Sequence, residues 1–195
     1  MSRNKLLLIV TGLLCNLGAL LLVAWVGFRK SPVDVTSRTV ISIQLGQECV
    51  QKGIQLREWA KDGATEATNV AASECRVVRS PPGQRSFMYF IIDPQFKLAA
   101  LMDVLVTVEY FDDGPGEFRL NYDAVVLPEN KRSGYETAAD RQKCLGSQRW
   151  QKAHFIAHDA QFKNSQNGGA DFRLEVRMPV LYVRRVTVER LSERP

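Results

Sequence analysis

Apolar and polar side chains alternate along much of the chain beyond residue 39. Ile41, Ile43 and Leu45 alternate with polar neighbours, and the same period of two recurs through residues 104–110. Because successive side chains of a β-strand point to opposite faces, this pattern predicts half-buried strands. In all, strands are predicted at residues 41–45, 75–78, 87–92, 104–110, 118–122, 150–157, 172–178 and 181–188. Turn signals separate them and no long amphipathic helix intervenes, which predicts an all-β sandwich of two antiparallel sheets.

Two of these strands carry more specific expectations. Residues 87–92 read FMYFII and are apolar at every position, as in a central strand that is buried between layers. The strands at 104–110 and 118–122 are separated by the turn sequence DDGPG, so we expect them to form a β-hairpin with a long turn. Residues 128–148 are polar and predict a loop with a strand or a helical turn.

The end of the chain, residues 162–191, predicts two antiparallel strands separated by a break at Pro179. Within the second strand the apolar positions change parity, being odd-numbered through Val183 and even-numbered from Val186. One extra residue, at Arg184 or Arg185, would return both sets to a single face. The sequence therefore predicts a β-bulge there.

The N-terminal segment is of a different kind. Residues 6–28, which begin at Leu6 and end at Phe28, contain no charged side chain and are long enough to cross a bilayer of about 30 Å as a helix. The length of this run and the aromatic Trp25 near its end favour a transmembrane anchor over the alternative, a cleaved signal peptide. Basic residues flank both ends, so charge alone does not set the orientation. We expect an anchor at residues 1–30, a tether at 31–38 and the sandwich at 39–195.

The net charge of +5 belongs almost entirely to the N-terminal segment. Residues 1–30 hold four of the 26 basic side chains and none of the 21 acidic ones, so the remainder carries 22 basic against 21 acidic groups. A nucleic-acid-binding domain is expected to show a basic surplus. The near-neutral remainder argues against nucleic-acid binding.

Four cysteines are too few for a disulfide scaffold in a domain of this size. Cys15 lies in the apolar segment, which leaves Cys49, Cys75 and Cys144. Two alternatives remain open from the sequence, a bridge between Cys49 and Cys75 or three reduced, buried thiols.

Several stretches in combination resemble a known module. They are, in chain order, DGATEAT, ECRVVR, FMYFIID, VTVEYFDDGPGEFRLNYDA, FKNSQNGGADFRLEV and LYVRRVTVERL. In this order they resemble the galactose-binding-like jelly-roll modules that are appended to bacterial secreted glycoside hydrolases. The resemblance implies a two-sheet jelly roll, an extracytoplasmic location and a role in recognising carbohydrate. Modules of this group often carry structural calcium, although the sequence indicates no ligand set for it.

A sugar-binding site needs an aromatic face for the pyranose ring and planar polar groups for its hydroxyls. Residues of these types on predicted loops are Trp59, Asp62, Tyr135, Asn164, Gln166 and Asn167. Each has a structural alternative: Trp59 could be largely buried, and the Asn167-Gly168-Gly169 run is first of all turn chemistry. Trp150 opens a strand and is expected in the core.

The sequence offers no positive sign of catalysis. Asp112 and Asp113 are adjacent in a turn, where carboxylates are commonly solvated turn formers. His154 and His158 are four residues apart, which on a strand separates them by about 13 Å and argues against a shared zinc ion. No nucleophile and base motif is present. We expect a membrane-anchored, extracytoplasmic and non-catalytic module that binds polysaccharide; the alternative is a structural or protein-interaction component of a cell-envelope assembly.

Overall fold

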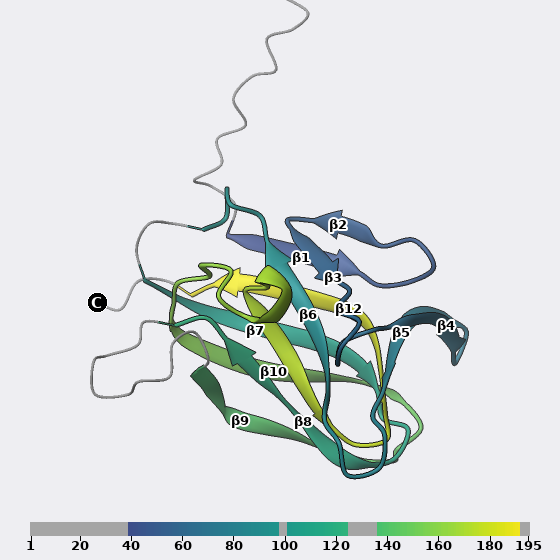
Figure 1. Ribbon diagram of the computed structural model, residues 1–195. Coiled ribbons are helices and arrows are strands. Elements are labelled where there is room, and N and C mark those ends of the chain that lie inside the picture. The colour runs from purple at the N-terminus through teal and green to yellow at the C-terminus, as the bar shows by residue number, and fades with distance from the viewer. Residues whose placement is uncertain (1–38, 98–100, 125–135, 192–195) are drawn as a thin grey trace, which may run out of the picture. The chain divides into compact units, whose positions relative to one another are not determined.

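The computed structural model describes residues 39–97, 101–124 and 136–191. These residues fold as two antiparallel β-sheets that pack face to face (Figure 1). The predicted all-β sandwich is therefore confirmed. The predicted anchor, residues 6–28, lies outside the described residues, and no helix within them is long and apolar enough to cross a membrane.

The described residues form a seven-stranded and a five-stranded sheet. The first contains β1 (Val40–Gln44), β2 (Val50–Lys52), β4 (Glu66–Val70), β5 (Ser73–Arg79), β7 (Met102–Phe111), β10 (Trp150–Ala160) and β12 (Val180–Arg190). The second contains β3 (Ile54–Arg57), β6 (Ser86–Ile92), β8 (Pro115–Tyr122), β9 (Glu136–Leu145) and β11 (Phe172–Arg177). Their orders are β10-β7-β12-β1-β2, with β5 and β4 added beside β12, and β3-β6-β11-β8-β9.

The core lies between the two sheets and follows the alternation in the sequence. Ile41, Ile43 and Leu45 are buried from one sheet, while Phe90 and Phe172 stack from the other with ring centroids 4.9 Å apart. Five apolar residues of the C-terminal stretch are also buried there: Phe162, Phe172, Leu174, Val186 and Val188.

Two pairings expected from the sequence are wrong. β7 pairs with β10 and β12, whereas β8 pairs with β11 and β9, so the predicted hairpin is instead a crossing from one sheet to the other. Their apolar faces meet across the core, where the rings of Tyr110 and Phe118 lie edge to face at 5.0 Å. In the same way β11 and β12 lie in different sheets on either side of the break at Pro179.

The predicted bulge in β12 is confirmed. The register between β12 and β7 shifts between Val183 and Arg185, so that Arg184 is the extra residue. Val183 and Val186 are therefore both buried, although three positions separate them. At the same point the other edge of β12 changes partner, from β5 up to Val183 to β1 from Arg185 onward.

β6 differs from the expectation of a strand buried between layers. It is an interior strand of its sheet, between β3 and β11, but only Met88, Phe90 and Ile92 face the core. The alternate positions, among them Phe87 and Tyr89, face outward. The outward face of β6 therefore carries apolar side chains that are not part of the core.

The turn after β7 is held by Asp112, which is buried rather than solvated. Its carboxylate accepts the backbone N–H groups of Leu145, Gly146 and Ser147 at 2.9–3.0 Å. Burial pushes the pKa of Asp112 upward, but these donors outweigh it and the pKa lies below its usual value. Asp112 is thus a turn former that fastens the β9–β10 connection to the end of β7.

The thiols and histidines are placed as follows. Cys49, Cys75 and Cys144 are all free, which decides between the two alternatives left by the sequence, although Cys49 is only half-buried. His154 and His158 lie on the strand β10 and engage different partners, Thr107 and Asp103.

Candidate functional site

The outward face of β6 carries the most distinctive group of side chains. Phe87 is half-buried there, and the guanidinium of Arg173 from the neighbouring β11 lies 4.2 Å from its ring centroid. Arg173 also approaches the Tyr89 hydroxyl with Nη1 at 3.5 Å. An aromatic ring under a planar cation is a stable arrangement on a sheet surface, worth about 0.5–1 kcal/mol.

Trp59 reaches this face from the turn that follows β3. The turn is closed by two backbone hydrogen bonds between Trp59 and Gly63, and Phe87 N–H donates to the Asp62 carbonyl at 2.8 Å. Gly63 packs directly on the ring of Tyr89, since a Cβ at this position would lie 2.5 Å from two ring carbons. The lack of a side chain at Gly63 therefore allows the turn to lie on β6.

The Tyr89 hydroxyl joins three segments of the chain. It donates to Asp62 Oδ1 at 2.9 Å and receives the Asn167 amide at 3.3 Å, in addition to Arg173. Burial, together with the bond to Asp62, raises the pKa of Tyr89 to about 12. The phenol stays protonated at neutral pH and fixes the turn, β6 and the loop before β11 to one another.

That loop, residues 161–171, includes a 3₁₀ turn, η2 (Asn167–Gly169), which lies beside β6 in Figure 1. Gly168 adopts φ +68°, as expected for the Asn-Gly-Gly turn, and packs on the Trp59 ring, where a Cβ would lie 2.9 Å from the nearest ring atom. Arg57 Nε donates to the Gly168 carbonyl at 3.0 Å. The loop is thereby fastened to β3 and to Trp59.

Two buried aspartates, Asp123 and Asp171, fix the conformation of the loop at residues 161–171 through hydrogen bonds. Asp123 Oδ2 accepts the backbone N–H groups of Lys163 and Ser165, both at 2.8 Å, and the Ser165 hydroxyl at 2.9 Å. Asp171 is fully buried and pairs with the Lys97 ammonium at 2.8 Å. Buried carboxylates with several donors specify one loop conformation, because each lost partner would leave a desolvated charge.

We call the group formed by Trp59, Phe87, Arg173 and Asn167 the aromatic platform. Trp59 and Phe87 are both half-buried, so part of each ring reaches solvent. The planar guanidinium of Arg173 lies over the Phe87 ring, and both it and the amide of Asn167 bond to the Tyr89 hydroxyl. Partly exposed rings beside planar polar groups are suited to a ligand that has an apolar face and hydroxyls at its edge.

The structure brings together three of the residues proposed from the sequence. Asp62 and Asn167 both bond to the Tyr89 hydroxyl, and Gly168, the neighbour of Asn167, packs on the Trp59 ring. Asn164 is exposed, but its side chain is occupied by Lys97, Gly169 and Asp171. The amide therefore shapes the loop.

Gln166 is only 3% exposed, which corrects the expectation that it faces a ligand. It is buried because the loop folds back on itself through the Gln166–Ala170 backbone bond. Tyr135 lies outside the described residues. Sequence reasoning missed Phe87, Tyr89 and Arg173, although the odd-numbered aromatic positions of β6 were a usable signal.

Within residues 39–97, 101–124 and 136–191, no three metal-ligating side chains of the His, Cys, Asp or Glu type come together. The Asp112 and Asp171 carboxylates instead accept N–H groups.

No protein-family model and no curated protein matches the sequence. Among solved structures the chain is similar to a family 29 carbohydrate-binding module from Piromyces equi, with 11% identity, a TM-score of 0.46, and 77% of this chain and 90% of that chain covered. It is also similar to the CBM22-1–GH10 modules of a Clostridium thermocellum xylanase, with 12% identity, a TM-score of 0.45, and coverage of 72% and 26%. A family 28 module specific for non-crystalline cellulose gives 12% identity, a TM-score of 0.37 and coverage of 75% and 89%.

Proposed function

We propose that the sandwich binds carbohydrate without catalysing a reaction, and that the aromatic platform is the binding surface. The observation that supports this proposal is the joint placement of two half-exposed rings, Trp59 and Phe87, beside the planar polar groups of Arg173 and Asn167. A pyranose has one apolar face and a rim of hydroxyls, which such a surface matches.

The platform is held in place by hydrogen bonds and close packing within the protein itself, which supports a binding role. Its side chains come from β6 and β11 and from two loops that are tied to them through the Tyr89 hydroxyl. Side chains that are already ordered lose little further entropy when a ligand binds.

A glycan array tests the proposal with the full-length chain in a detergent without a sugar headgroup, because a glycosidic detergent would compete. We expect binding to a polysaccharide fragment that Trp59→Ala and Phe87→Ala each weaken about tenfold or more, as loss of a stacking ring predicts. Tyr182→Ala removes a half-buried ring from the other sheet and is the matched control. Equal affinities for all of these chains would contradict the proposal.

The alternative, a protein-interaction component, is favoured by the charges beside the platform. Glu175 of β11 is buried among Arg85, Arg119 and Arg177 at 2.8–3.3 Å, which makes an ordered charged surface on the same face. Silence on the array together with stoichiometric co-purification of one protein, lost on Glu175→Gln, is the result expected of this alternative.

We also propose that residues 6–28 anchor the protein in a membrane with the sandwich on the extracytoplasmic side. The uncharged length of this segment supports the proposal. A C-terminal alkaline phosphatase fusion should be active and should stay in the membrane fraction after carbonate washing. An inactive fusion, or a released one, would contradict it.

A further inference from the structure

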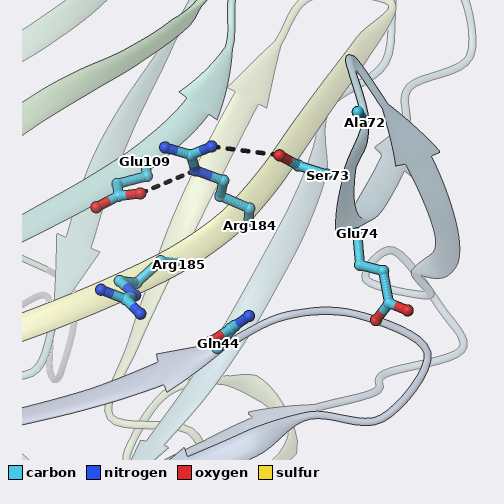
Figure 2. Close-up of a pocket in the computed structure, with 7 residues that line it drawn as sticks. All are labelled: Gln44, Ala72, Ser73, Glu74, Glu109, Arg184 and Arg185. Atoms are coloured by element: carbon cyan, nitrogen blue, oxygen red, sulfur yellow. Dashed lines mark hydrogen bonds and ion pairs between the residues drawn. The ribbon is translucent and has the colours of Figure 1, made fainter.

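The seven-stranded sheet carries a pocket that is unrelated to the aromatic platform. It has a volume of about 550 Å³ and lies at the point where β12 changes partner from β5 to β1. Its lining residues are Gln44, Ala72, Ser73, Glu74, Glu109, Arg184 and Arg185 (Figure 2). This volume is within the range of small-molecule sites.

The bulge in β12 creates the chemistry of the pocket. In a regular strand Arg184 and Arg185 would point to opposite faces, and one of them would enter the core. Because Arg184 is the extra residue, both side chains line the same pocket. Bulges commonly re-aim side chains in this way.

The two arginines are in different electrostatic situations. Arg184 donates to Glu109 at 2.9 Å and to Ser73 at 3.4 Å, and its guanidinium lies 4.6 Å from the Trp150 ring centroid. Figure 2 shows it held between Glu109 and Ser73. Arg185 is exposed and has no ion-pair partner within the described part of the chain. The pocket therefore has one fixed, neutralised cation and one that is available.

Glu74, on the opposite side of the pocket from Arg184, limits which anions can bind. Glu74 is exposed, and within the described residues its carboxylate accepts one long contact, from the Gln47 N–H at 3.4 Å, so it can receive donors from a ligand. The Glu74 carboxylate lines the same pocket as Arg185 and would repel a dianion such as phosphate more strongly than a monoanion. A ligand with one carboxylate and several hydroxyls could pair its carboxylate with Arg185 and donate hydrogen bonds from its hydroxyls to Glu74.

We propose that this pocket binds the uronate unit of an acidic polysaccharide, with the sugar carboxylate paired to Arg185 and its hydroxyls to Glu74 and Gln44. The pocket lies on the seven-stranded sheet and the aromatic platform on the other, so uronate binding here does not depend on the function proposed for the platform.

Calorimetric titration of the full-length chain with tetragalacturonate tests the inference. We expect binding that Arg185→Gln weakens about tenfold or more, since a charge-assisted pair is lost. Binding should also weaken in about 1 M salt, where the screening length is about 3 Å. The methyl ester of the same oligosaccharide, which keeps the hydroxyls and lacks the charge, should not bind.

Two control variants separate this site from the platform. Arg141→Gln removes an exposed arginine from the five-stranded sheet and should bind tetragalacturonate as the unchanged chain does. Trp59→Ala removes the platform ring, and comparison of its effect with that of Arg185→Gln shows which surface holds the oligosaccharide. Loss of binding in Trp59→Ala with no effect of Arg185→Gln would overturn the inference and leave the proposed function standing. Equal binding of the ester, competition by inorganic phosphate, or no binding at all would also overturn it.

Discussion

At the scale of single residues, glycine at position 63 determines whether the platform can form. The ring of Tyr89 occupies the space that a side chain at Gly63 would need. This contact brings the Trp59 turn close enough for Asp62 to accept the Tyr89 hydroxyl. The lack of a side chain at Gly63 therefore allows the Trp59 turn, β6 and the loop before β11 to meet at Tyr89.

We expect Gly63→Ala to lower the free energy of unfolding by about 1–3 kcal/mol, as overpacking against a fixed ring does. Gly114→Ala is the matched control, because no atom lies within 4 Å of the Cβ it would add; it should change stability by less than about 0.5 kcal/mol. Urea denaturation followed by circular dichroism measures both, and similar effects of the two substitutions would contradict the contact described for Gly63.

At the scale of elements, the backbone of the β4–β5 turn is strained, whereas the β9–β10 connection is stabilised by hydrogen bonds. The β4–β5 turn places Ala71 and Ala72 at φ +46° and +58°, a left-handed conformation that side chains other than glycine and asparagine adopt at a cost. The β9–β10 connection is instead held by the three N–H groups that Asp112 accepts.

Replacing the turn by its favoured sequence, Ala71→Asn with Ala72→Gly, should stabilise the protein by about 1 kcal/mol or more, because each alanine in this conformation costs about that much. Ala67→Gly in β4 introduces glycine without relieving a left-handed residue and should destabilise. The midpoints of urea unfolding of the two variants should move in opposite directions; movement in the same direction would contradict the turn geometry.

Asp112 predicts a pH dependence. Its pKa in the folded chain is lowered by hydrogen bonds, so its contribution is complete above the ordinary aspartate pKa of about 3.9 and is lost as the pH falls below it. Asp112→Asn should cost about 1–3 kcal/mol at neutral pH. The difference between the two chains should shrink as the pH falls below about 3.9 and through the lower pKa of the folded chain. A difference that is independent of pH would show that the charge of Asp112 is not what holds the connection.

At the scale of the whole molecule, alternation in the sequence predicted which side chains face the core but not which strands are neighbours. The parity change at Val183 and Val186 was enough to find the bulge, because burial of one face leaves a single register. The turn DDGPG gave no such constraint, since the same residues can close a hairpin or lead to the opposite sheet. For the candidate site, loop chemistry indicated Trp59 and Asn167, whereas Arg173 required knowledge of strand order.

The packing of the two sheets should protect the buried thiols of Cys75 and Cys144 from reagents in solution. Cys144 lies in the core that both sheets share, and burial raises its pKa to about 12, while burial raises that of Cys75 to about 11. We expect a maleimide to modify Cys49 readily in the folded protein and Cys144 only at the rate of unfolding. Mass spectrometry of timed digests measures these rates, and modification of Cys144 as fast as of Cys49 would contradict the described packing.

The position of β12 has a consequence for the order of events during synthesis. Among the strands of the described residues this one is synthesised last, yet it pairs with β1, β5 and β7 and is the centre of its sheet. One edge of β1 pairs with the nearby β2, but the other edge pairs with residues nearly 150 positions later in the chain, with Ile41 opposite Val188. Such distant pairing makes folding slow, on a timescale of milliseconds to seconds. The seven-stranded sheet can therefore be completed only after β12 has been synthesised, because β12 lies between β7 and β1.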